Sequence, residues 1–240
     1  MSIAAYFQCY KQPFATYYAL QSFRTSYPTQ TIILVSDNGY NYSKMAKHFN
    51  CMYIHSDCNY PLINDIDDKY KLKVHGLIER IIYACSLIKE EYIIWLEDDV
   101  YVHRHLTLPL IYDLNGYCPN TISSKHFISL KGDFPNLNNE IRISGHGGSI
   151  YKKDSLIKSL TNTNPINTLL DNWKIYFGPE ANLCQDLFIS ILLHINGYSI
   201  GPLEGHGDSS ELNSNFTIQH QYKKYYGIPM PEELSYLYEK

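Results

Sequence analysis

The sequence lacks a long apolar run. The longest candidate, 187–195, is interrupted by Ser190 and His194, whereas a helix that crosses a bilayer needs about 20 consecutive apolar residues. The first residues show neither the basic segment nor the apolar stretch of a secretory signal. The sequence therefore predicts a cytoplasmic protein without a transmembrane segment, located in the host cytoplasm if the source is a virus.

Excess basic charge and paired cysteines are absent as well. The chain has 20 Lys and Arg against 24 Asp and Glu, a formal net charge of −4, whereas proteins that coat nucleic acid concentrate positive charge. We therefore expect no nucleic acid partner. None of the 6 cysteines forms a CxxC pair, so the pattern indicates no zinc ribbon or disulfide framework, and reduced thiols are expected.

What is present is the composition of a globular domain. Hydrophobic residues make up 45% of the 240 residues and charged residues 18%, which is ordinary for a protein with a buried core. Neither a linker nor an internal repeat interrupts the chain. We therefore expect a single domain over residues 1–240.

The first hundred residues alternate between apolar runs and segments with helical spacing of apolar residues. The expected elements are strands over 3–7, 31–35, 51–55 and 91–96, and helices over 14–23, 42–49 and 69–88. Nearly continuous β-branched runs are typical of parallel strands covered on both faces. The pattern predicts a parallel α/β sheet with right-handed crossovers, and ligands bind such sheets beyond the carboxyl ends of the strands.

The second half is less regular. We expect a strand over 122–129, helices over 154–160 and 182–194, and a short strand over 198–200, while 59–68 is polar and predicted to be a loop. The last forty residues are rich in loops and aromatic side chains. Their basic, aromatic segment 222–226 is interpreted as a surface segment, with contacts to a pyrophosphate, a sugar or a membrane surface as alternatives.

An acidic triplet, Glu97, Asp98 and Asp99, directly follows the most apolar strand. Side chains alternate along a strand, so Glu97 and Asp99 should point the same way and Asp98 the opposite way. Carboxylates crowded at a ligand-binding edge repel one another unless a cation lies between them, and Mg²⁺ or Mn²⁺ prefers such oxygen ligands. The alternative is a solvated turn that caps a helix.

The stretch 92–100 resembles the strand and DxD-type motif of GT-A glycosyltransferases, which are metal-dependent enzymes that use nucleotide-diphosphate sugars. Other segments similar to this family follow in the family's order: 19–28, 33–39, 145–150, 185–188 and 197–198. The resemblance covers about residues 3 to 206, and Gln185 stands where the family usually has Glu. It implies a GT-A fold: a Rossmann-like, mostly parallel central sheet flanked by helices, with a smaller acceptor-side sheet.

The resemblance also divides the single domain into a nucleotide-binding half, about 1–102, and an acceptor-binding half, about 103–240. It places the donor beside the first two strands, the helix before the metal strand, and the glycine-rich loop. A turn aspartate, a solvated helix face and an ordinary glycine-rich turn are the structural alternatives for these positions. The expected donor-binding residues are Gln8, Tyr10, Asp37, Lys73, Arg80, Asp98, Gly147, Gly148 and Ser149.

For the metal, the resemblance implies Glu97 and Asp99 together with a histidine or aspartate near the C-terminus. His206 fits this position best, with Asp208 and His220 as rivals. Asp186 is the expected catalytic base, since an inverting transfer needs a carboxylate that deprotonates the acceptor hydroxyl. A carboxylate that merely favours a helix N-terminus is the alternative for Asp186.

These observations lead to one expected function. The protein would transfer a sugar from a UDP- or GDP-sugar to a hydroxyl of a glycan, a protein or a lipid-linked acceptor, with Mn²⁺ or Mg²⁺ and inversion of configuration. A sugar nucleotidyltransferase is one alternative, although the segment 8–13 after the first strand has no glycine. A non-catalytic module that binds nucleotide sugars or carbohydrate is the other.

Overall fold

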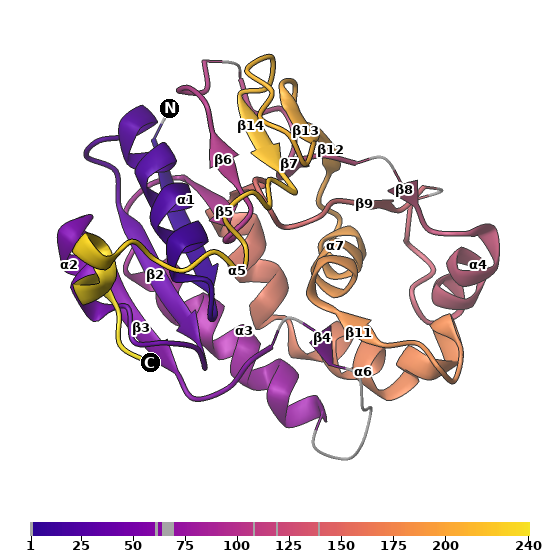
Figure 1. The fold of residues 1–240 in the computed structure, drawn as a ribbon. Coiled ribbons are helices and arrows are strands. Elements are labelled where there is room, and N and C mark those ends of the chain that lie inside the picture. The colour runs from indigo at the N-terminus through magenta and orange to yellow at the C-terminus, as the bar shows by residue number, and fades with distance from the viewer. Residues whose placement is uncertain (1, 61, 64–69, 108, 119, 139) are drawn as a thin grey trace.

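The computed structural model describes residues 2–60, 62–63, 70–107, 109–118, 120–138 and 140–240. Its centre is a seven-stranded sheet in the order β12-β7-β10-β5-β1-β2-β3 (Figure 1). The sheet is mostly parallel, because only β10 runs antiparallel to its two neighbours. Its strands are β1 (Ile3–Cys9), β2 (Ile32–Asp37), β3 (Met52–Ser56), β5 (Tyr92–Leu96), β7 (Leu114–Gly116), β10 (Ile150–Lys152) and β12 (Ile200–Pro202).

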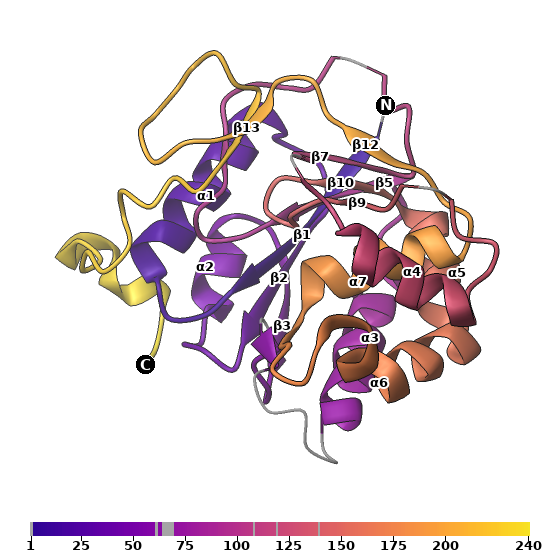
Figure 2. The ribbon, with the colours of Figure 1, turned by 90° about the vertical axis from the view of Figure 1, so that its right-hand side faces the viewer.

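Helices cover both faces of this sheet (Figures 1 and 2). They are α1 (Pro13–Ser26), α2 (Ser43–His48), α3 (Tyr70–Ser86), α4 (Ser124–Asp133), α5 (Lys153–Thr161), α6 (Thr163–Phe177) and α7 (Gln185–Ile195). Successive strand residues alternate between two cores: Phe7 packs in the core with α1 and α2, whereas Tyr6 packs in the core with α3, α5, α6 and α7. This burial on both faces explains the continuous apolar runs.

A smaller sheet extends the carboxyl end of β5. It contains β6 (Tyr101–Val102), β14 (Ile218–His220) and β13 (His206–Asp208), with β14 in the middle. β14 is antiparallel to β6 and parallel to β13. Two further pairs join β11 (Leu183–Cys184) to β4 (Leu62–Ile63) and β8 (Asn120–Thr121) to β9 (Arg142–Ile143).

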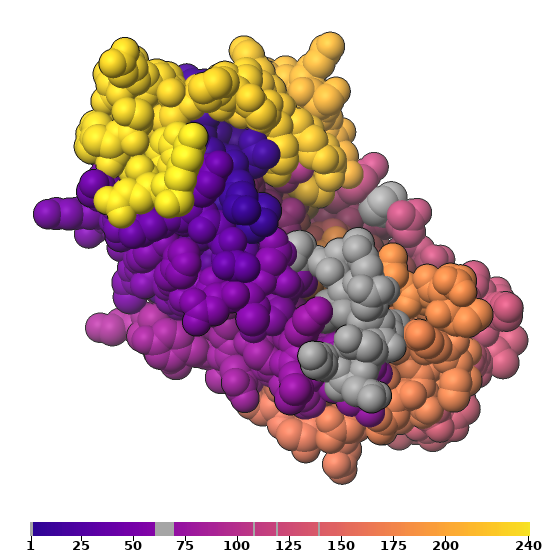
Figure 3. Space-filling model, turned by 60° about the horizontal axis from the view of Figure 1, so that its bottom comes forward, coloured from indigo at the N-terminus to yellow at the C-terminus, as the bar shows by residue number. Residues whose placement is uncertain are grey.

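The C-terminal segment returns to the N-terminal half. Figure 3 shows it, in yellow, lying against the indigo residues of the chain start. The Gly227 amide donates to the side chain of Gln12, and Asn41 forms an isolated bridge with Glu239. Between these contacts lies a short 3₁₀ helix, η1 (Glu232–Leu237). None of the helices in the described ranges has the length and apolarity that crossing a bilayer requires.

The fold class expected from the sequence is confirmed: the chain has a GT-A-type, mostly parallel central sheet with flanking helices and a smaller second sheet. The strand expected over 122–129 is wrong. Residues from Ser124 onward form α4, because the Ser123 side chain caps the helix by accepting from the His126 amide. Most of the predicted loop 59–68 lies outside the described residues, which include β4 within that range.

Helix α6 was not expected. Its buried residues Ile166, Leu169, Leu170 and Trp173 recur at helical spacing. Pro165, near the start of this pattern, occupies the first turn, where a proline is tolerated because the amide there has no partner within the helix. The apolar spacing is therefore the signal that identifies this helix.

Candidate active site

The acidic triplet lies in the turn between β5 and β6. Its alternation is as the strand pattern predicted: Glu97 and Asp99 both approach His220, whereas Asp98 turns toward α1 and accepts a hydrogen bond of 2.5 Å from the Thr16 hydroxyl. Burial raises the pKa of Asp98 to about 7, with Thr16 lowering it and Asp99 raising it. Glu97 and Asp99 thus face the small sheet, and Asp98 faces the first strand and helix.

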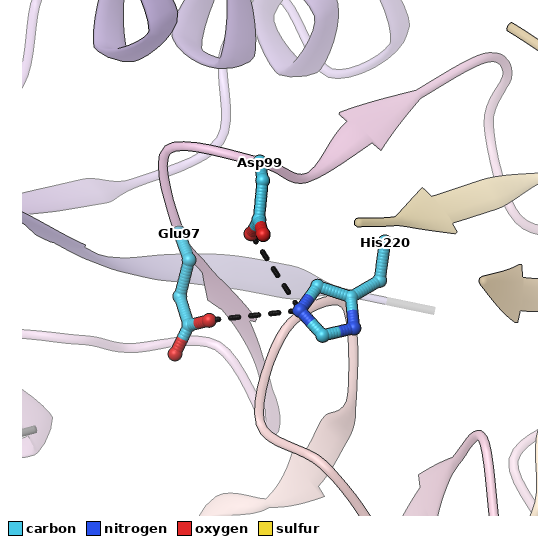
Figure 4. Close-up of side chains that lie close together, drawn as sticks. All are labelled: Glu97, Asp99 and His220. Atoms are coloured by element: carbon cyan, nitrogen blue, oxygen red, sulfur yellow. Dashed lines mark ion pairs between the residues drawn. The ribbon is translucent and has the colours of Figure 1, made fainter. Parts of the chain in front are cut away.

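Strand pairing brings His220 to these carboxylates. Ile218 and Gln219 of β14 pair with Val102 and Tyr101 of β6, so the next residue along β14 arrives beside the turn that precedes β6. The Nε2 atom of His220 lies 3.5 Å from Asp99 Oδ1 and 3.8 Å from Glu97 Oε2. Figure 4 shows both carboxylates pointing at this nitrogen.

Two neighbours hold the His220 ring in this orientation. Its Nδ1 atom lies 3.1 Å from Asp208 Oδ1, which is adjacent in the pairing of β13 with β14. A hydrogen bond from a histidine's far nitrogen to a carboxylate is the usual arrangement behind a metal-ligating imidazole. On the ring's other side lies Gly147, where a Cβ atom would overlap the imidazole. Gly147 therefore leaves the space that the ring occupies.

The three side chains fit a divalent cation. One donor atom from each of Glu97, Asp99 and His220 can be chosen so that all lie within 4.8 Å of one another. Adjacent ligands in an octahedron with bonds of about 2.1 Å are about 3 Å apart, so small rotations close the site. Asp99 Oδ1 is buried and has no hydrogen-bond partner among the described residues. Buried polar atoms normally have a partner, so this oxygen is available to bind a cation.

Electrostatics also favour a cation at this place. Burial, followed by the negative charges of Asp186 and Asp99, raises the pKa of Glu97 well above its usual range. The Lys223 ammonium lies 3.7 Å from Asp99 Oδ2, but its side chain is largely exposed. A lysine at the rim offsets only part of the repulsion, so a bound divalent ion would stabilise the carboxylate forms further.

The structure does not place His206, the histidine expected at this site, among these donors. The His206 ring is buried against Gly148, and neither of its nitrogens is exposed to solvent or hydrogen-bonded within the described chain. Burial, with a contribution from His220, lowers its pKa to about 3 and keeps the imidazole neutral. His220, considered from the sequence only as a rival, occupies the position instead.

A first cavity, of about 200 Å³, opens beside the triplet at the carboxyl ends of β1 and β2. It brings together four of the expected donor-binding residues. Its lining is Gln8, Cys9, Tyr10, Asp37, Asn59, Glu97, Asp98 and Tyr226. Tyr226 comes from the C-terminal segment, whose aromatic and basic character was interpreted as surface. The segment's place in the site follows from the stack of Tyr225 on Tyr18 of α1, a contact that no local pattern reveals.

Arg80 lies beneath this cavity and not on its wall. It is buried, pairs with the Asp37 carboxylate, and donates to the Gln8 side chain at 2.9 Å. Burial raises the pKa of Asp37, and the Arg80 charge opposes that rise. The guanidinium thus fixes the two polar side chains that face the cavity. Lys73, in contrast, is exposed on α3 and lines neither cavity of the site.

A second cavity, of about 260 Å³, is lined in part by His220, one member of the candidate metal-ligand group formed by Glu97, Asp99 and His220. Its lining is Tyr117, Asn120, Ile143, Gly145, Gly147, Asp186, His206, Asp208 and His220. Asp186, at the start of α7, presents a partly exposed carboxylate to it. Ser149 is not part of this lining. It is fully buried, and its hydroxyl is hydrogen-bonded within the loop, to Gly145 and Ser144. Gly148 has a φ of +83°, which supports the loop's turn.

Similarity to known proteins is found in the fold and not in the sequence. No family model matches the sequence, and neither does any curated protein. Among solved structures, the galactosyltransferase LgtC in complex with donor and acceptor sugar analogs aligns over 97% of this chain and 99% of its own, with 11% identity and a TM-score of 0.52. An active-site glutamine-to-glutamate variant of LgtC aligns over 96% and 98%, with 10% identity and a TM-score of 0.54.

The glycosyltransferase GlyE of Streptococcus pneumoniae TIGR4 is a third match, with 11% identity over 85% of this chain and 46% of its own, and a TM-score of 0.44. At these identities the likeness to LgtC establishes the fold. The alignment covers nearly the whole of both chains, so the likeness concerns the fold as a whole.

The close contact between Gly147 and His220 predicts that a methyl group added at Gly147 would weaken metal binding. In a Gly147→Ala variant the new Cβ would push the imidazole away from Glu97 and Asp99, and we expect Mn²⁺ affinity to fall by about tenfold or more. Titration calorimetry with Mn²⁺ measures this. Gly132→Ala on α4, where a Cβ meets nothing within 4 Å, is the matched control and should bind as wild type does.

The raised pKa of Glu97 predicts a pH dependence with a definite sign. A metal ligand must be deprotonated, and Glu97 holds its proton to a higher pH than an ordinary carboxyl group does. Mn²⁺ affinity should therefore rise as the pH is raised from about 5 to about 8, by up to about tenfold per unit for a single coupled proton. Affinity that stays constant over this range in wild type, or that varies equally in Glu97→Gln, contradicts the assignment.

Proposed function

We propose that the protein is a divalent-metal-dependent glycosyltransferase that moves a sugar from a nucleotide-diphosphate sugar to an acceptor hydroxyl. The observation that carries the proposal is that members of the candidate metal-ligand group line two different cavities. Glu97 lines the first cavity and His220 lines the second. A substrate whose diphosphate lies at the group would extend its nucleoside into one cavity and its sugar into the other.

The first cavity has the chemistry of a nucleoside site. Tyr10 and Tyr226 offer aromatic rings at its wall, and bases stack on such rings. Gln8 and Asp37, held by Arg80, offer an amide and a carboxylate to the polar edge of a base or to ribose hydroxyls. We propose a UDP- or GDP-sugar as the donor, since both present hydrogen-bond donors to a carboxylate or amide oxygen.

The metal site would serve the leaving group. Glu97, Asp99 and His220 would hold a divalent ion, which would supply positive charge to the leaving diphosphate, and Mn²⁺ or Mg²⁺ suits the mixed oxygen and nitrogen donors. Lys223 adds a second positive charge next to Asp99. Its long, exposed side chain can rotate from that carboxylate toward a phosphate.

The second cavity would receive the donor sugar and the acceptor. Asp186 is the carboxylate that we assign to deprotonation of the acceptor hydroxyl, a step that general-base catalysis accelerates. With Asp186 as the base, the hydroxyl attacks from the face opposite the diphosphate, and the configuration inverts. The acceptor itself, whether glycan, protein or lipid-linked sugar, is not specified by these residues.

The fold shared with LgtC supports the proposed glycosyltransferase activity. That galactosyltransferase was solved with donor and acceptor sugar analogs and covers nearly the whole of this chain. A fold alone hosts many activities. The proposal therefore depends on the Glu97, Asp99 and His220 group and the two cavities beside it.

The proposed function predicts metal-dependent release of a nucleoside diphosphate. Incubation with a panel of UDP- and GDP-sugars and Mn²⁺ should yield UDP or GDP, detected by a coupled assay, and EDTA should abolish the release. Asp99→Asn should abolish it too while the melting temperature stays near that of wild type. Release that persists with EDTA contradicts metal dependence. Binding of a donor without turnover of any acceptor would favour a non-catalytic binding module.

Asp186→Asn tests the base. The amide keeps the shape of the carboxylate but accepts no proton, so transfer should fall by about 10²–10⁴-fold while donor affinity in the presence of Mn²⁺ changes little. Product NMR should show inverted anomeric configuration. Parallel loss of donor affinity would make Asp186 a donor ligand, and a retained configuration would remove its role as the base.

A further inference from the structure

His146 is a buried histidine behind the proposed base. It lies in the glycine-rich loop between β9 and β10, and its side chain is only 1% exposed. The imidazole stacks on Trp95, with ring centroids 4.2 Å apart and planes 18° apart. Tyr6 packs against the same indole at 4.4 Å. Packing therefore fixes the plane of the His146 ring.

Each ring nitrogen of His146 faces one polar group. Nδ1 is hydrogen-bonded to the Tyr151 hydroxyl. Nε2 lies 3.4 Å from Asp186 Oδ1, a contact at ion-pair distance, and has no hydrogen-bond partner within the described chain. The Asp186 side chain is 40% exposed, so this carboxylate has its buried side against the histidine and its open side toward the second cavity.

The proton positions follow from these contacts. Burial lowers the pKa of His146, although Asp186 opposes this, and the ring is thus neutral. Burial raises the pKa of the Tyr151 hydroxyl well above its usual range, so that group keeps its proton and donates it. Nδ1 must then be the acceptor, which leaves the single ring proton on Nε2, facing Asp186.

We propose that His146 is a positioning residue for Asp186: from the 3.4 Å contact, a small rotation of the carboxylate lets Nε2–H donate to Oδ1 and fix the carboxylate orientation, while Tyr151 fixes the tautomer. This inference rests on the proposed function, because it assigns the role through Asp186. Oδ2 is left for the acceptor hydroxyl. A Cβ at Gly145 would be in ordinary van der Waals contact with Oδ2, at 3.8 Å, and glycine places no side chain beside that oxygen.

Two substitutions separate the hydrogen bond from the packing. His146→Phe keeps a ring against Trp95 but loses the donor, and we expect kcat for transfer to fall by about 100-fold with little change in the donor KM, as misorientation of a reacting group predicts. His146→Gln places an amide N–H near the position of Nε2 and should recover most of the rate. The kcat of Tyr151→Phe should lie between those of His146→Phe and His146→Gln.

His194→Gln is the matched control. His194 is also buried, but its Nε2 contacts the backbone of Arg142 instead of Asp186, so this variant should transfer sugar at close to the wild-type rate. If kcat falls equally in His146→Phe and His146→Gln, the positioning role is overturned and His146 is purely structural. The same holds if the donor KM rises in step with the loss of kcat.

An NMR measurement tests the His146 tautomer and its contact with Asp186 without any need for turnover. In ¹⁵N-histidine NMR of the wild-type protein, His146, assigned by its absence in His146→Gln, should show a protonated Nε2 and an unprotonated Nδ1. Asp186→Ala should accelerate exchange of the Nε2 proton with water. A proton on Nδ1, or exchange unchanged by Asp186→Ala, overturns the proposal. If no donor is turned over while both NMR results hold, the proposed function fails and the His146–Asp186 hydrogen bond stands.

Discussion

The pairing of β14 with β6 is the interaction on which the candidate site depends. It joins residues 218–219 to 101–102 and so brings a histidine to an acidic turn more than a hundred residues earlier in the chain. Tyr222 extends the pairing by donating its amide to the Asp99 carbonyl. Without these backbone hydrogen bonds, Glu97 and Asp99 would be an exposed acidic turn with no third ligand.

The same pairing organises the surroundings of the site. β13 joins β14 on its other side and supplies Asp208 behind His220. After β14, the chain crosses the carboxyl end of the central sheet, where Lys223 and Tyr226 reach the acidic turn and the first cavity. One strand thus connects the metal-ligand group to both cavities. Burial, together with the negative charges gathered at this junction, raises the pKa of Glu97, and a bound cation would offset the repulsion between the carboxylates.

The sequence predicted the first half of the fold well, because parallel strands buried on both faces leave continuous apolar runs such as Ile32–Val35. The acidic triplet could be singled out for the same reason, since Glu97 and Asp99 directly follow such a strand, and the structure places both beside His220. The short strands of the smaller sheet have three residues or fewer, too few to show a period. The choice between His206 and His220 was therefore not decidable from local pattern.

Other features depend on side-chain hydrogen bonds and contacts, some local and some between distant residues. The strand expected over 122–129 failed because a serine cap decided the local structure, and Ser149 was assigned to the donor although its hydroxyl is bonded inside its own loop. The 3.4 Å contact between His146 and Asp186 joins the glycine-rich loop to the start of α7, forty residues later in the chain. Such a relation becomes visible only when burial and the orientation of both side chains are known.

The most direct test of the account is the position of a bound metal. A crystal soaked in Mn²⁺ should show an anomalous difference peak about 2.1–2.3 Å from a carboxylate oxygen of Glu97, from one of Asp99 and from Nε2 of His220. The nucleoside diphosphate, when added, should complete the coordination. A peak at His206, or no peak at the acidic turn at saturating Mn²⁺, would contradict the account.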